Sequence, residues 1–409
     1  MRTITIVGGG QSGLQLGCGL AKRDYDVRIV QNRTADQIRE GKVLSSQCMF
    51  GAALQNERDL GLNFWEETCP TVDSINFCVP APDGSSQKAI DWNGTLDRPA
   101  QSVDQRIKIP AWIAEFERRG GHMTIHDAGI ADLEAYARKS DLVIVAAGKG
   151  EIATLFQGNA EQSPFDKPQR ALALTYVHGM TPRADHSGVN FNLIPTVGEY
   201  FVFPALTVSG PCDIMVFEGL PGGPMDCWTD VKTPSEHLAR SRWILDRFLP
   251  WEADRCRNLE LTDANGILSG GFTPIVRNPV GFLPSGAPVF GMADSVCLND
   301  PITGQGSNSA AKAAKVYTDA IIGHGDQLFD TSFMQATFNT YWRYAQYVVG
   351  WTNALLRPPP QHVLKLLTAA QSQPTLAKRI ANAFDHPPDL FPWFAVPEEA
   401  DQYLRQLAA

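Results

Sequence analysis

The chain lacks long apolar runs, cysteine pairs at metal-ligand spacing and any excess of positive charge. Its longest apolar stretches, such as residues 142–147, are far shorter than the roughly 18 residues that a membrane-spanning helix needs. None of its eight cysteines forms a Cys-x-x-Cys pair, so no metal site is expected. The net charge of -9 disfavours a mainly electrostatic nucleic-acid binder, because such proteins are basic.

No secretory signal is expected at the start of this sequence, since residues 1–7 lead into glycine without a basic start, an apolar core and a cleavage site. Scattered cysteines in such a chain are typical of reduced thiols, so a cytoplasmic location is expected. The chain does have 409 residues, 44% of them hydrophobic and 19% charged, which suits a globular protein of two domains. Its 35 glycines follow no fixed period, which excludes a collagen-like chain.

The clearest motif lies near the N-terminus. Residues 3–7 predict a buried strand, and the next six residues fit the G-x-G-x-x-G pattern before a helix that extends to about residue 22. In this pattern Gly8 permits a tight turn, Gly10 lets a pyrophosphate approach the backbone, and Gly13 permits close packing of the helix. Gln11 and Ser12 start the helix, where N–H groups favour phosphate. A glycine-rich turn without a ligand is the alternative.

A second predicted strand, residues 27–30, ends without the acidic residue that normally binds a ribose at this place. Gln31, Asn32 and Arg33 stand there instead, and an amide can still hydrogen-bond a hydroxyl. We expect Arg33 to lie near the adenosine end of a nucleotide. A solvated surface arginine is the alternative interpretation.

The predicted secondary structure changes twice along the rest of the chain. Residues 141–148 and 288–292 are apolar runs typical of parallel strands covered on both faces. Between them, Val-, Phe- and Tyr-rich segments broken by Pro and Gly predict an antiparallel sheet, and the chain after residue 304 is mostly helical. We therefore predict an α/β fold with a discontinuous Rossmann-like domain (1–170 and 269–325, of which about 65–100 contributes to the substrate pocket), an inserted antiparallel β-sheet substrate domain (171–268) and a helical C-terminal region (326–409).

A second glycine motif occupies residues 291–308. Asp294 is followed seven residues later by Pro301, and then by Gly304-Gln305-Gly306 before a long helix. This spacing resembles the second FAD motif of flavoprotein aromatic hydroxylases, although Ala293 stands where that family has glycine. The resemblance implies a Rossmann-like FAD-binding domain of the aromatic hydroxylase type. It also implies a set of FAD contacts: Asp294 on the ribityl chain, and Pro301, Gly304, Gly306, Ser307 and Asn308 near the flavin.

Arg106 matches a helix-start arginine that contacts FAD in the same families, with a structural salt bridge as its alternative. The Asp-Gly motif that binds both FAD and NAD(P)H in single-component hydroxylases reads Ala147-Gly148 here, so only Gly148 is kept as an FAD contact. There is also no second G-x-G-x-x-G for a nicotinamide. We infer that a separate NADH-dependent flavin reductase supplies reduced FAD.

These motifs together resemble the FAD-dependent oxygenase component of two-component styrene and indole monooxygenases, the group E flavoprotein monooxygenases. The resemblance extends over nearly the whole chain and is most specific at residues 163–172, for which the sequence offers no physical reason. It implies FAD and O2 as cofactor and cosubstrate. It also implies epoxidation of indole at C2=C3, or of a styrene-type alkene, through a flavin C4a-hydroperoxide.

The residues that face the substrate separate the subgroups of this family. Six positions match the indole-preferring subgroup in place of the styrene residues: Ser45, Gln47, Met49, Val72, Ile75 and Ala100. An amide at Gln47 can hydrogen-bond an indole N–H, and the apolar members provide adaptable walls for a bicyclic ring. Ser45 and Ser46 match residues beside the flavin N5, and we predict that they orient the peroxide.

Two other functions stay open on the sequence alone, a single-component NAD(P)H-dependent aromatic hydroxylase and a non-catalytic FAD-fold binding protein. Consumption of NADH by the pure protein would favour the first. Failure to form a C4a-peroxide from reduced FAD and O2 would favour the second. A small aromatic substrate is expected, without nucleic-acid or membrane partners, and the oligomeric state is open, a homodimer included.

Overall fold

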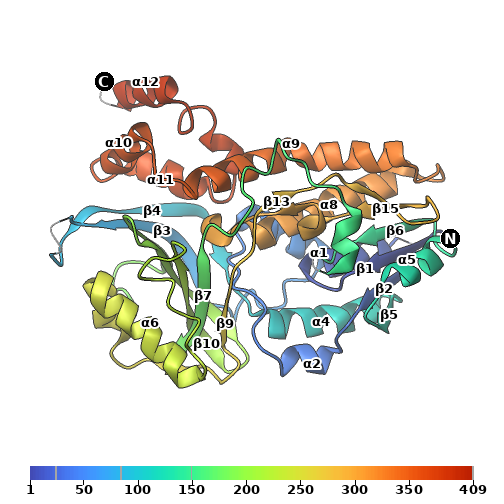
Figure 1. Ribbon diagram of the computed structural model, residues 1–409, viewed down its shortest axis with the longest axis horizontal. Helices are drawn as coiled ribbons and strands as arrows, with labels where there is room; N and C mark the ends of the chain where they lie inside the picture. The colour runs from blue at the N-terminus through green and yellow to red at the C-terminus, as the bar shows by residue number, and fades with distance from the viewer. Residues whose placement is uncertain (24, 83–84, 149, 408–409) are drawn as a thin grey trace.

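The computed structural model describes residues 1–23, 25–82, 85–148 and 150–407. It contains two main sheets side by side, with α9 (Thr331–Leu355) along the top of the first and the C-terminal helices over the second (Figure 1). This agrees with the predicted α/β fold, in which a Rossmann-like part is joined to a second sheet.

The first sheet has the strand order β14-β15-β6-β1-β2-β5. All neighbours run parallel except β14 and β15, which form an antiparallel pair. Apolar residues fill both faces of its central strands, which is why β6 reads as a continuous apolar run. Its strands are β1 (Thr3–Val7), β2 (Asp26–Gln31), β5 (His122–Ile125), β6 (Leu142–Val145), β14 (Val280–Phe282) and β15 (Pro288–Gly291), and nearby helices are α1 (Gln11–Ala21), α2 (Ala35–Arg39), α4 (Gln105–Arg118), α5 (Ile130–Ala137) and α8 (Gly306–His324).

The second sheet has the order β11-β7-β10-β9-β8-β3-β4, with β12 also paired to β7. The pairs among β7, β8, β9, β10 and β11 are antiparallel, as predicted for residues 171–268, whereas β3, from outside that range, joins the sheet by running parallel to β8. This parallel pairing is possible because β3 reaches the sheet from the first domain and does not follow a hairpin. Its strands are β3 (Thr71–Pro80), β4 (Lys88–Gln101), β7 (Ala171–His178), β8 (Gly188–Ile194), β9 (Gly198–Thr207), β10 (Gly210–Gly219), β11 (Glu260–Leu261) and β12 (Ile267–Gly270), with α3 (Gly51–Leu60), α6 (Pro234–Phe248) and α7 (Pro250–Ala253) around it and a separate short ladder of β13 (Ile275–Val276) and β16 (Cys297–Leu298).

The C-terminal helices belong to both cores. The first half of α9 packs Phe333, Phe338 and Tyr341 into the apolar cluster of the first sheet, whereas Trp351 near its end joins that of the second. A side chain at Gly94 of β4 would overlap the backbone of α11 (Pro374–Asn382), so this helix lies directly on the strand. With α10 (Gln361–Ala369) and α12 (Pro397–Leu407), α11 covers the β3–β4 side of the sheet (Figure 1).

All eight cysteines are unpaired, and seven of them are buried. Within the described ranges, no helix is both long enough and apolar enough to cross a membrane. Nor do His, Cys, Asp and Glu side chains of that part of the chain gather in groups of three or more that could hold a metal ion.

Candidate active site

The glycine loop connects β1 to α1 at the carboxyl edge of the first sheet. Gly8 has φ +122°, and a Cβ there would lie 2.8 Å from the carbonyl carbon of Ala146. A Cβ at Gly13 would overlap the carbonyl oxygen of Gly8, whereas one at Gly10 would meet nothing within 4 Å. Packing therefore requires glycine at the first and last positions, and the middle position opens onto free space beside the helix N-terminus. This geometry fits a bound pyrophosphate.

The two glycine motifs meet at this edge. β1 lies between β2 and β6, so the strand order reverses beside it. Open α/β sheets bind ligands outside the carboxyl ends of their strands at such a reversal. Gly148, just after β6, packs so closely on Asp294 that a Cβ there would lie 2.6 Å from the Cβ of Asp294. The hydroxyl of Ser295 donates to the carbonyl of Val145 at 2.8 Å, which holds the second motif against the end of β6.

Ala293 has φ +53°, a left-handed conformation that glycine adopts far more readily than alanine. The FAD motif that this segment resembles has glycine at this position. The left-handed φ gives a physical reason for glycine at this position, which this chain fills with alanine.

The turn before α8 leaves backbone donors exposed. Asp300 accepts a 3.1 Å hydrogen bond from the N–H of Ile302 and begins a short turn that includes Pro301 and ends at Gly304, whose φ is +62°. The N–H groups of Gly306 and Ser307 belong to the first turn of α8, where an α-helix has no acceptor for them. These donors and the helix dipole favour an anionic group beside the turn, as expected for a reduced flavin.

The side chain of Asn308 is not free to bind a ligand. Its Oδ1 accepts from the N–H of Phe50 at 2.8 Å, and its Nδ2 donates to the carbonyls of Cys48 and Gly304 at 2.8 and 2.9 Å. Only its backbone can contact a flavin. The side chain instead ties the segment that contains Gln47 and Met49 to the turn before α8.

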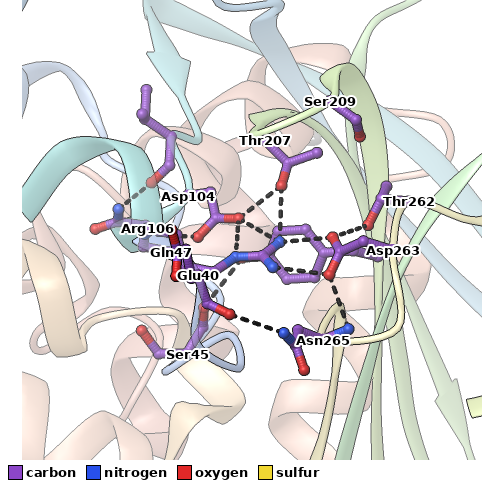
Figure 2. Close-up of polar contacts among 12 residues, drawn as sticks. Glu40, Ser45, Gln47, Asp104, Arg106, Thr207, Ser209, Thr262, Asp263 and Asn265 are labelled. Atoms are coloured by element: carbon purple, nitrogen blue, oxygen red, sulfur yellow. Dashed lines mark hydrogen bonds and ion pairs between the residues drawn. The ribbon is translucent and has the colours of Figure 1, made fainter. Parts of the chain in front are cut away.

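The guanidinium of Arg106 is buried and bonded to protein groups (Figure 2). Asp263 receives two of its N–H groups at 2.9 and 3.0 Å, Asp104 accepts from Nε at 2.9 Å, and Thr207 accepts a fourth bond at 3.1 Å. These contacts match the structural salt bridge that was the alternative for Arg106. The arginine joins α4 to β9 and to the turn between β11 and β12.

Arg33 lies half-buried after β2, and its guanidinium has no hydrogen bond or ion pair with any residue that the structure describes. Its carbonyl accepts from the side chain of Gln31 at 2.7 Å, which fixes the chain at this point. Its predicted position near an adenosine therefore stays a prediction.

The segment before α3 places Gln47 in the interior, where its amide nitrogen is hydrogen-bonded and its amide oxygen has no partner among the described residues. Gln47 is 4% exposed, and its Nε2 donates to the carbonyl of Val103. Its Oε1 is buried and has no donor among the described residues. Because the nitrogen faces a carbonyl, the amide orientation is settled, and a buried acceptor is available for a ligand N–H.

Ser45 and Ser46 precede this glutamine and are half-buried. The carbonyl of Ser45 accepts a 3.1 Å hydrogen bond from the hydroxyl of Tyr176 in β7, which ties the segment to the second sheet. In the part of the chain that the structure describes, neither serine hydroxyl has a hydrogen-bond partner. Both remain candidates for contact with a reacting group.

Val72, Ile75 and Ala100 lie in one apolar cluster. Val72 pairs directly with Ala100 across β3 and β4, and the ladder is irregular between Val72 and Ser74. This irregularity explains how two residues three apart on one strand join the same cluster. Met49 belongs to a separate small cluster with Ala53, Leu54 and Ala311, so the four apolar side chains do not form one continuous wall.

Sequence reasoning missed a buried ion pair beneath the glycine loop. Lys108 of α4 donates to Glu57 of α3 at 2.8 Å, and each side chain is only 1% exposed. Gln11, the first residue of α1, donates to the same oxygen at 2.9 Å. The sequence carried only a partial signal, since Lys108 lies one turn before Trp112 on α4 but nothing nearby in sequence indicates Glu57 as its partner.

Comparison with known proteins adds to this geometry. Residues 148–255 match the family model described as "Styrene monooxygenase A putative substrate binding domain". The chain is 28% identical to styrene monooxygenase StyA of Pseudomonas fluorescens in an alignment that covers 100% of this chain and 98% of that protein.

Two solved structures share the fold. The flavoprotein/dehydrogenase from Cytophaga hutchinsonii aligns over 100% of both chains with a TM-score of 0.66 and 11% identity. The flavin-dependent halogenase CmlS aligns with 98% of this chain and 71% of its own, with a TM-score of 0.64 and 17% identity. At these identities the likeness concerns the fold alone.

Proposed function

We propose that the chain is an oxygenase component of the styrene monooxygenase type. In this role it epoxidises indole at C2=C3 or a related styrene-type alkene. A separate NADH-dependent flavin reductase would supply the reduced FAD, and the reaction would take place in the cytoplasm. The full-length similarity to a styrene monooxygenase supports the reaction class. The unpaired buried acceptor on Gln47 is the observation that carries the choice of indole.

The residues present fit FAD. Gly8 to Gly10 and the start of α1 would hold the pyrophosphate, Gly148 and Asp294 would border the ribityl chain, and the turn at Gly304 would border the flavin. When bound and reduced, FAD would react with O2 and supply an electrophilic oxygen atom to the alkene. The unpartnered hydroxyls of Ser45 and Ser46 would hydrogen-bond the reacting oxygen, and the apolar residues around them would exclude water.

A Gly10→Ala substitution is expected to weaken FAD binding at least about tenfold without changing folding. The added methyl group meets nothing in the protein, and φ at this residue is -85°, which alanine adopts freely. The methyl would instead occupy the place of a pyrophosphate. Equilibrium titration with FAD and urea unfolding measure the two effects. Gly323→Ala, at the far end of α8, should leave the affinity unchanged, and equal FAD affinity in all three proteins would contradict the assignment.

Gln47 distinguishes the two candidate substrates by one hydrogen bond. Indole presents an N–H that styrene lacks, and Oε1 of Gln47 is a buried acceptor to which no described residue donates. A site with an unpaired acceptor favours the substrate that satisfies it, because the acceptor is otherwise left buried and unbonded.

A Gln47→Leu substitution is therefore expected to lower kcat/KM for indole about tenfold, the value of one ordinary hydrogen bond. The corresponding value for styrene should change much less. Initial rates with chemically reduced FAD and O2 measure both. As a control, 1-methylindole has no N–H, so it should react equally with the original and substituted proteins. A similar loss for indole and 1-methylindole would show that Gln47 acts only through packing.

The proposed reaction is tested most directly by mixing the pure protein with chemically reduced FAD, O2 and either indole or styrene. Formation of blue indigo from indole would support the proposal. Styrene oxide with unreactive indole would overturn the substrate choice, and no oxygenated product from either compound would overturn the reaction class.

A further inference from the structure

One buried cation and three carboxyl groups meet where the second sheet approaches the turn before α8. Arg170 precedes β7, Glu199 and Glu218 lie in β9 and β10, and Asp300 begins the turn that ends at Gly304. None of the four is more than 4% exposed. Glu199 and Glu218 are direct cross-strand partners, so two acidic residues face each other in the ladder.

Arg170 forms a two-bond ion pair with Glu199. Its Nε and Nη2 donate to the two oxygens of that carboxylate at 2.7 and 2.9 Å. Its other contacts are the carbonyls of Gln169, Leu355 and Leu356. These bonds supply a physical reason for the arginine in residues 163–172, and they leave Glu218 and Asp300 without a hydrogen bond from this cation.

Glu218 and Asp300 lack donors for three of their oxygens. Both oxygens of Glu218, and Oδ2 of Asp300, are buried and have no donor among the described residues. The two side chains nevertheless interact with each other. Two ionised carboxylates can only accept, so a contact between them becomes a hydrogen bond only when one of them carries a proton.

The surroundings favour such a proton. Burial, together with the carboxylates of Asp300 and Glu199, raises the pKa of Glu218 well above its ordinary value of 4.5, against the opposing effect of Arg170. Burial likewise raises the pKa of Asp300 to about 6, which the Ile302 N–H and Arg170 only partly offset. Of the pair, Asp300 is the better site for the negative charge, because it accepts the Ile302 N–H.

We propose that Glu218 is a neutral carboxylic acid in the folded protein, that its proton bridges to Asp300, and that this bridge positions the turn from Asp300 to Gly304 beside reduced FAD. Asp300 then has a donor on each side, Ile302 on Oδ1 and Glu218 on Oδ2. Glu218 is a positioning residue, since it acts through the turn. The last part rests on the proposed function, which takes FAD to be the group at this turn.

The bridge makes stability and flavin binding depend on pH in a defined direction. A carboxyl with a raised pKa binds more protons in the folded state than in the unfolded state, so its contribution to stability is complete below about pH 4.5 and decreases as the pH rises toward the folded-state value. Loss of the proton puts two negative charges side by side in the interior and removes the bridge. Affinity for reduced FAD should therefore decrease at alkaline pH.

The proton itself is tested on the protein without flavin. Infrared difference spectra at pH 7 should show the carbonyl stretch of a protonated carboxyl, which disappears in Glu218→Gln and persists in Glu260→Gln, the same change at an exposed position of the same sheet. The fall in thermal midpoint between pH 5 and 9 should be smaller in Glu218→Gln than in the other two proteins. A carboxyl band that survives Glu218→Gln would overturn the inference.

The positioning role is tested by anaerobic titration with reduced FAD at pH 6 and 9. The unmodified protein should bind about tenfold more weakly at pH 9, the effect of one pKa unit. Glu218→Gln and Asp300→Asn each supply a permanent amide donor to the pair, so both should bind equally at the two pH values. The original pH dependence in both variants would exclude the role. If the unmodified protein does not bind reduced FAD, the proposed function fails. The infrared test still decides whether Glu218 carries a proton.

Discussion

Replacing Lys108 with Met is expected to lower the free energy of unfolding by about 3–5 kcal/mol, the loss typical of a buried charge deprived of its partner. Lys108 donates to Glu57 at 2.8 Å, and both side chains are 1% exposed. Methionine keeps most of the volume of lysine but supplies no donor. Among the residues that the structure describes, Gln11 would then be the one remaining hydrogen-bond donor to the carboxylate of Glu57.

Urea unfolding at pH 7 measures this loss. The double variant Glu57→Gln with Lys108→Met should recover most of it, because the new amide is neutral and still accepts from Gln11. As a matched control, Lys365→Met breaks an ion pair with Asp401 whose side chains are 50% and 44% exposed, and it should cost less than about 1 kcal/mol. Equal losses from the two lysine substitutions would contradict the importance of burial.

This ion pair also shows what the sequence can and cannot predict. The strand before Gly8 and the helix after it were predictable, because a buried strand, a glycine turn and a helix are encoded within about twenty consecutive residues. Glu57 and Lys108 lie on different helices. Only the packing of α3 and α4 against α1 brings them together.

Arg106 also illustrates that local sequence patterns do not reveal partners that are distant in the chain. Its place at the start of a helix was predictable from sequence, and a family resemblance suggested a flavin contact. Its main partner, Asp263, lies 157 residues away in a turn of the second sheet, so the salt bridge could not be derived from local pattern. The parallel pairing of β3 with β8 was hidden for a related reason, since strand direction is set by a long connection that leaves no periodic signal.

Replacing Asn308 with Leu is the other substitution for which we expect a large effect, first on the free energy of unfolding. The amide of Asn308 makes three hydrogen bonds in the interior, to Phe50, Cys48 and Gly304. Asn308→Leu has a similar volume but leaves the N–H of Phe50 and the carbonyl of Cys48 buried without partners. A loss of about 2–4 kcal/mol in the free energy of unfolding is expected, since each unsatisfied group costs about 1–3 kcal/mol.

The same substitution should lower kcat/KM about 100-fold for indole and styrene alike. The amide holds the segment of Gln47 and Met49 at a fixed distance from the turn at Gly304, and small displacements of a reacting pair reduce rates by about this factor. A loss independent of substrate distinguishes Asn308 from Gln47, whose substitution should affect indole selectively. More H2O2 should also be released per product, because the alkene is no longer held where the oxygen atom is transferred.

The chain offers a matched control for this prediction in Asn382, which makes the same pattern of three bonds between α11 and β4. Its Oδ1 accepts from Asp97 at 2.8 Å, and its Nδ2 donates to Thr95 and Lys378 at 2.9 and 2.8 Å. Asn382→Leu should reduce stability, although less because this side chain is partly exposed. It should leave the ratio of product to H2O2 unchanged. If both leucine variants change that ratio equally, loss of stability alone explains the effect, and Asn308 has no special role in placing the substrate segment beside the flavin turn.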